Sequence, residues 1–202
     1  MSPIVAPLNE TLASIYGAYR LACGDTRGLN YFNATYEGFW RSFSAAIIIA
    51  PVFIIFLSIQ YSYDAKNVNL MRFFYIHSIA YVTGWVAFPL LIFHLANLLK
   101  FNQGIICYII SYNWCSLLQN LIYLPFVIIV GAFQIQGGII NTIGIFLLGL
   151  VILYTWFISK VALNISGLFA VVIVMIDLFL IILINSTARI LIWIILRKKD
   201  GH

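Results

Sequence analysis

A single acidic side chain, Asp177, lies within a long apolar run near the carboxyl end of the chain. Placing a carboxylate at the centre of a membrane helix costs at least about 2.5 kcal/mol, so such a residue is directed toward other helices. There it either handles a proton or cation, or forms a hydrogen bond that ties helices together, which is the more common role. Suitable partners occur in other apolar stretches, at His94, Asn97, Asn113 and Gln119.

A polar patch interrupts the third apolar stretch at residues 111–116, and two amides follow it. In lipid these side chains need partners within the protein, because no water is available to them. Asn113, Gln119 and Asn120 either line a small hydrophilic cavity or form hydrogen bonds between helices. The second interpretation is favoured, because polar side chains commonly join membrane helices.

The histidines and cysteines have the wrong spacing for a metal or haem site. His77 and His94 fall on one predicted helix, about 25 Å apart along its axis at 1.5 Å per residue, so they cannot hold one iron together. Cys23, Cys107 and Cys115 form no Cys-x-x-Cys pair, and two of them lie in apolar stretches, where a small buried side chain is the expected role. No metal ion and no cofactor is predicted.

Common catalytic motifs are also absent from the sequence, including G-x-S-x-G, H-E-x-x-H and the phosphate-binding P-loop. The chain holds only 6 Asp and Glu residues, which leaves little material for acid–base chemistry. No catalytic residue is assigned, and a non-enzymatic protein is expected.

The elements that carry these residues are apolar enough to lie in a membrane. Hydrophobic residues make up 63% of the chain and charged residues 8%, against about 25% charged in soluble domains. Residues 101–159 include no Lys, Arg, Asp or Glu. The net charge of +5 comes from basic residues at the ends of apolar runs, which favours contact with lipid headgroups over nucleic acid.

A membrane-spanning helix needs about 20 apolar residues, and this length predicts an all-α integral membrane bundle of about five transmembrane helices. Four or six spans are the alternatives, because several runs exceed the minimum. The distribution of Lys and Arg between the two sides is nearly even, so the positive-inside rule does not decide the orientation. The predicted spans are 44–61, 72–99, 105–133, 142–159 and 162–184.

Interfacial segments are expected on both sides of the bundle, which divides the chain into 1–43, 44–185 and 186–202. From Leu8 to Tyr19, apolar residues recur with helical spacing, which predicts an amphipathic helix that lies on the membrane or on the bundle and is ended by Gly24 and Asp25. Polar residues 185–187 are expected to end the last span before an interfacial helix at 189–196. The expected interface anchors are Trp40, Arg41, Arg197, Lys198 and Lys199.

Small residues recur at every fourth position before Asp177, at Ala162, Ser166 and Ala170. On one helix they would form a stripe that lets another helix approach closely. The stripe therefore predicts helix-mediated association, with the protein itself or with another membrane protein.

Two segments resemble the Yip1-like polytopic membrane proteins: residues 37–43, EGFWRSF, and the stretch from YTWFISKVAL at 154–163 through Asp177. The resemblance implies five closely spaced spans after a cytosolic amino-terminal segment, in a scaffold of the bacterial inner membrane. Eukaryotic members carry an Asp-Leu-Tyr-Gly-Pro motif before their membrane domain, and this chain lacks it. Their Rab-binding role in vesicle traffic is therefore not carried over.

Two other functions stay open beside an associating scaffold. One is a small proton- or cation-coupled transporter or channel that uses Asp177. The other is a subunit of a larger membrane complex.

Overall fold

The computed structural model describes residues 6–64, 68–99 and 104–200, and within these ranges it consists of helices and connecting turns. Side chains at 64, 97–99 and 195–200 lie outside the described part. The elements are α1 Leu8–Ala22, the 3-10 helix η1 Thr26–Tyr31, α2 Tyr36–Ser42, α3 Ser44–Asp64, α4 Leu70–Leu99, α5 Ile105–Ala132, α6 Gly138–Ala162 and α7 Gly167–Asp200.

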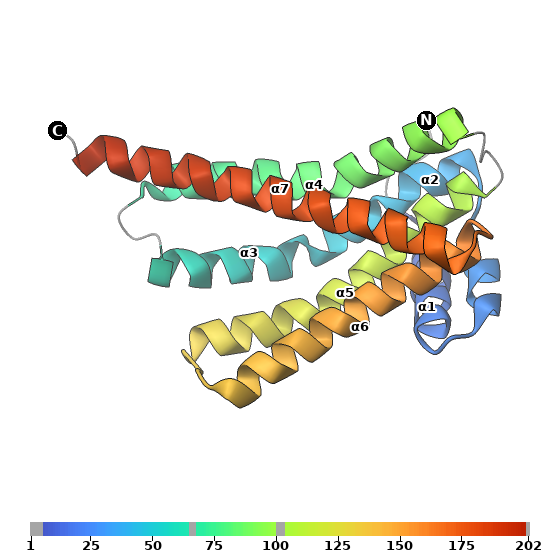
Figure 1. Cartoon of the computed structure of the whole chain (residues 1–202), viewed down its shortest axis with the longest axis horizontal. Coiled ribbons are helices and arrows are strands. Elements are labelled where there is room, and N and C mark those ends of the chain that lie inside the picture. Colours follow the sequence, from blue (N-terminus) through green and yellow to red (C-terminus); the bar gives the residue numbers. More distant parts are fainter. Residues whose placement is uncertain (1–5, 65–67, 100–103, 201–202) are drawn as a thin grey trace.

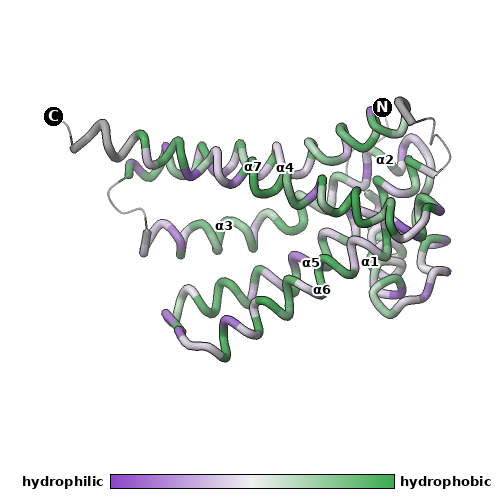
Figure 2. The backbone as a smooth tube through the Cα atoms, in the orientation of Figure 1, coloured by the Kyte–Doolittle hydropathy of each residue, from purple (hydrophilic) through white to green (hydrophobic). Residues whose placement is uncertain are grey.

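Five helical stretches of the described chain are long and apolar enough to cross a membrane. Helices α2 and α3 together form the first stretch, and α4, α5, α6 and α7 each provide one more. The predicted all-α membrane bundle of five spans is confirmed. Figure 2 shows apolar residues along these long helices, with hydrophilic residues most frequent around the amino-terminal helices.

The long helices run roughly side by side, with the amino-terminal elements gathered at one end (Figure 1). Helix α3 packs on α5, α4 on α7, and α6 on both α5 and α7. The amino-terminal helix α1 packs on η1 and on α5, and α2 also packs on α5. Helix α5 therefore holds the amino-terminal elements to the membrane-spanning part.

Two predicted breaks do not occur. Helix α5 continues through residues 111–116, and α7 continues through 185–187 as far as Asp200, so the expected separate helix at 189–196 is part of α7. Two of these polar side chains form hydrogen bonds within their own helix. The Asn185 amide donates to the Ile181 carbonyl, and the Thr187 hydroxyl donates to the Leu183 carbonyl, each at 2.8 Å. Such bonding back to the preceding turn leaves the helix intact.

The predicted stripe of small residues is wrong, because its members lie on different elements. Ala162 is the last residue of α6, Ser166 lies in the following turn, and Ala170 belongs to α7. Asn164 reverses the chain there, with a φ of 51°, a left-handed conformation that Asn tolerates at the end of a helix. Ala162 and Ala170 are both buried.

Candidate functional site

Asp177 lies inside the bundle and is 6% exposed. Its Oδ1 atom accepts a hydrogen bond from the Tyr112 hydroxyl at 2.8 Å, which joins α7 to α5. Among the described side chains the partner is therefore Tyr112, and not His94, Asn113 or Gln119. The arrangement fits an acid that ties two helices together.

Aromatic and hydroxyl side chains surround this pair. The Phe88 ring of α4 lies 4.5 Å from the Tyr112 ring, measured between centroids. One turn earlier on α5, the Tyr108 hydroxyl lies 2.9 Å from the Ser159 Oγ atom of α6. The four helices α4, α5, α6 and α7 thus meet around one buried polar centre.

The amides of α5 bond in three different ways. Gln119 donates to the Thr155 hydroxyl of α6 at 3.1 Å, and Asn113 donates to the Ser42 hydroxyl of α2 at 2.9 Å. Asn120 donates to the Ser116 carbonyl of its own helix at 2.8 Å. Gln119 and Asn113 therefore join helices, whereas Asn120 stays local.

The two remaining polar candidates lie on α4. His94 is exposed, and the side chain of Asn97 lies outside the described residues. The other histidine of this helix, His77, is buried, with its ring 4.5 Å from that of Phe73. Within the described chain, no three His, Cys, Asp or Glu residues lie together as metal ligands would.

Helix α1 faces the bundle with its small residues. Four of its large apolar side chains point outward: Leu8 is 72% exposed, and Leu12, Tyr16 and Tyr19 are also exposed. The inward face carries Ser14, Gly17, Ala18 and Leu21. The outward apolar face, at one end of the spans, suits a helix lying in the membrane interface.

An ion pair attaches α1 to α2. The Arg41 guanidinium donates to the Glu10 carboxylate at 2.9 Å, and the two side chains are only 16% and 17% exposed. The Asn33 amide donates to the second Glu10 oxygen at 3.2 Å. Arg41 was expected to anchor the chain to lipid headgroups, but it holds the amino-terminal elements together instead.

The other expected anchors differ in what the structure describes. Trp40 is half exposed on α2 and remains free to contact lipid. The side chains of Arg197, Lys198 and Lys199 lie outside the described residues.

A second ion pair closes the turn after α1. Arg20 bonds the carboxylate of Asp25, and this contact, followed by the backbone N–H of Arg27, lowers the pKa of Asp25 below its usual value. Arg20 also donates to the Tyr31 hydroxyl at 2.9 Å. Asp25 therefore keeps its negative charge at neutral pH and is balanced by two arginines.

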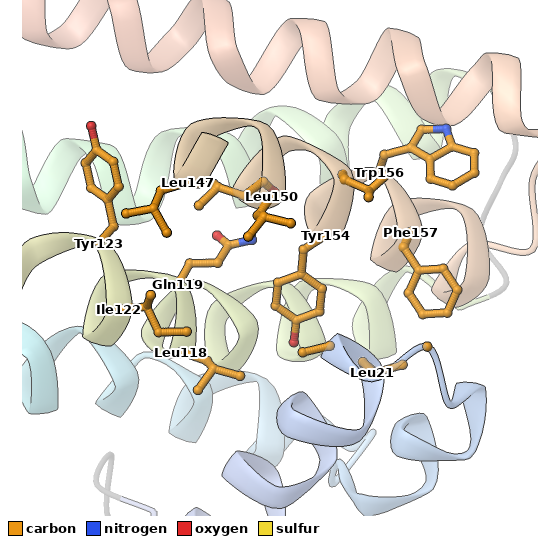
Figure 3. Close-up of a pocket in the computed structure, with 14 residues that line it drawn as sticks. Leu21, Leu118, Gln119, Ile122, Tyr123, Leu147, Leu150, Tyr154, Trp156 and Phe157 are labelled. Atoms are coloured by element: carbon orange, nitrogen blue, oxygen red, sulfur yellow. The ribbon is translucent and has the colours of Figure 1, made fainter. Parts of the chain in front are cut away.

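An apolar groove of about 460 Å³ lies between the end of α1 and helices α5 and α6. Figure 3 shows Tyr154 of α6 reaching toward Leu21 of α1, with Gln119 between the two long helices. The Tyr154 hydroxyl donates to the Ala18 carbonyl at 2.6 Å and so connects α6 to α1. Leu118, Ile122, Leu147 and Leu150 supply apolar walls.

No family model, curated protein or solved structure matches the chain. The Yip1-like resemblance therefore stays a prediction. Function must be inferred from the contacts of the chain itself.

Two features of the site have only a weak signal in the sequence. In the sequence, Tyr112 looks like any other aromatic residue of an apolar helix. Its only signal is that it lies in the same polar patch as Asn113. The groove depends on how α1 meets α5 and α6, and those segments are far apart along the chain. Helical spacing alone does not bring them together.

Proposed function

We propose that this integral membrane protein is non-enzymatic and acts by helix-mediated association with a second copy of itself or with another membrane protein. A Yip1-like scaffold of the bacterial inner membrane is the named form of this proposal. Its support comes from the outer face of α6.

The first half of α6 carries an exposed seam of four residues, Gly138, Thr142, Ile145 and Gly149, which we call the α6 seam. Their spacing of four, three and four residues places them on one helical face. A Cβ atom added at either glycine would meet no other atom within 4 Å. The α6 seam is therefore uncovered by the rest of the described chain.

Exposed apolar residues alone would only indicate lipid contact, because lipid is the solvent of this surface. The two glycines add a different property: they leave hollows along the helix. Small residues at an exposed face let the backbone of another helix approach, and close packing is what drives helix association in lipid. The α6 seam thus supports association better than lipid contact alone.

Replacing Gly149 with leucine is expected to raise the dissociation constant of the complex about ten-fold, or about 1.4 kcal/mol. The new side chain fills the hollow and keeps the partner helix away, while the monomer has room for it. Energy transfer between donor- and acceptor-labelled copies, diluted in lipid vesicles, measures this constant.

The matched control is Gly84→Leu on α4, where an added Cβ also meets no atom within 4 Å. This variant should associate like the wild type. Equal association of Gly149→Leu and the wild type would reject the α6 seam as the interface.

Native electrophoresis after mild detergent extraction tests whether the protein is a subunit of a larger membrane complex. A single small species would count against a multi-subunit assembly.

A second candidate function rests on Asp177, a buried carboxylate about 15 Å into α7 from its first residue at 1.5 Å per residue. A small proton- or cation-coupled transporter would place its coupling acid at such a depth. In that case Asp177→Asn abolishes proton-coupled flux in reconstituted vesicles, and Asp25→Asn outside the spans leaves it unchanged. Unaltered flux in Asp177→Asn would reject this candidate.

A further inference from the structure

We propose that the groove between α1, α5 and α6 holds an acyl chain of an anionic phospholipid. The lipid belongs to the leaflet next to the amino-terminal helices, and its headgroup meets Lys160. The inference does not rest on the α6 seam, because none of the four seam residues lines the groove.

The length of the groove matches one leaflet. Its lining on α6 runs from Leu147 to Phe157, which is about 15 Å at 1.5 Å per residue. The hydrocarbon core of a bilayer is about 30 Å thick, so one leaflet contributes about half of that. A volume of about 460 Å³ lies within the range of small-ligand sites, about 300–1,000 Å³.

The chemistry of the walls fits a hydrocarbon chain. Most lining residues are leucines and aromatic residues of α5 and α6. The amide nitrogen of Gln119 is already bonded to the Thr155 hydroxyl and the Val151 carbonyl. The Tyr154 hydroxyl is bonded to Ala18. These polar groups therefore leave an apolar surface in the groove, which suits an acyl chain.

The charge at one end of the groove fits an anionic headgroup. Lys160 is exposed in the last turn of α6, and its Nζ atom lies 5.2 Å from the centroid of the Trp156 ring. Trp156 is one of the groove residues, and its Nε1 atom donates to the carbonyl of Gly167, the first residue of α7, at 2.9 Å. Gly24 of the groove precedes Asp25, whose charge is more than balanced by Arg20 and Arg27. Positive charge thus dominates where the headgroup would lie.

The depth of this end also fits. The apolar face of α1, with Leu8, Leu12 and Tyr16, is exposed beside the same ends of α5 and α6. An apolar helix face at the end of the spans marks the level of the headgroups. A tryptophan beside a lysine is a typical pair at that level.

Native mass spectrometry of the full chain, titrated with dioleoyl phosphatidylglycerol or dioleoyl phosphatidylcholine in detergent, tests the proposal. The wild type should bind phosphatidylglycerol about five-fold more tightly, as expected for one lysine near the headgroup. Lys160→Gln should remove this preference while phosphatidylcholine binding stays unchanged.

Leu150→Trp should fill the groove and weaken binding of both lipids at least about ten-fold, because the chain loses its apolar contacts. The matched control is Leu148→Trp, an exposed residue of the same helix that does not line the groove. If Leu150→Trp does not fold, Leu147→Trp serves as the blocking variant at the far end. Equal lipid binding by blocking and control variants, or a preference that survives Lys160→Gln, would overturn the proposal.

Discussion

Gly38→Ala is expected to destabilise the amino-terminal segment by about 3 kcal/mol, the upper part of the range for forcing extra volume into a packed site. A Cβ atom at Gly38 would lie 1.9 Å from the carbonyl oxygen of Asn33. That oxygen belongs to the backbone, so it cannot rotate away. Moving it would disturb the Asn33 amide that bonds Glu10, and with it the attachment of α1. Unfolding in mixed micelles, followed by circular dichroism, measures the loss.

The control is Gly84→Ala, since a Cβ there has open space within α4. Alanine is the better helix former by about 1 kcal/mol, so this variant should equal or exceed the wild type in stability. Limited proteolysis of residues 23–35 should become faster only in Gly38→Ala. Equal stability of the two variants would contradict the close packing of α2 on the preceding turn.

The second large effect is expected at the buried polar centre. Tyr112→Phe leaves the Asp177 carboxyl without its hydrogen bond, and an unpaired buried polar group costs about 1–3 kcal/mol. In Tyr112→Phe with Asp177→Leu, neither partner is left unpaired, so the double variant should be more stable than the sum of the single effects. The expected coupling energy is about 1–2 kcal/mol. The unfolding free energies of the wild type, the two single variants and the double variant, measured in mixed micelles, give the coupling energy.

A second cycle provides the control. Tyr154 is also a partly buried tyrosine whose hydroxyl bonds between elements, but its partner is the Ala18 carbonyl. Tyr154→Phe combined with Asp177→Leu should therefore be additive within about 0.5 kcal/mol. Similar coupling in both cycles would mean that Asp177 acts through general packing and not through Tyr112.

The spans could be predicted from the sequence because lipid imposes a simple rule on composition. Stretches free of charge must be helical within the membrane, since no other conformation of one segment satisfies its own backbone. The predicted starts at 44 and 105 coincide with those of α3 and α5. The predicted end of the fourth span, 159, lies within one turn of Ala162.

Packing between helices could not be predicted in the same way. The sequence leaves open whether the apolar face of α1 lies on the membrane or on the bundle. In the structure α1 packs through small residues, and a Cβ at Gly28 of η1 would lie 2.5 Å from the Gly17 carbonyl oxygen. Close approach of backbones depends on small residues, and composition alone does not identify their partner. For the same reason the hydrogen bond from Tyr112 to Asp177 could not be predicted, because it joins residues 65 positions apart.

The outward apolar face of α1 also determines where the protein can adapt to bilayers of different thickness. Because α1 lies at the level of the lipid headgroups, the amino-terminal end of the bundle keeps a constant depth relative to the membrane surface. The opposite end has length to spare, because the 34 residues of α7 extend about 51 Å, against about 30 Å of hydrocarbon. A thicker bilayer therefore covers additional turns of α7 near its carboxyl end, and hydrophobic mismatch is absorbed there without submerging or lifting α1.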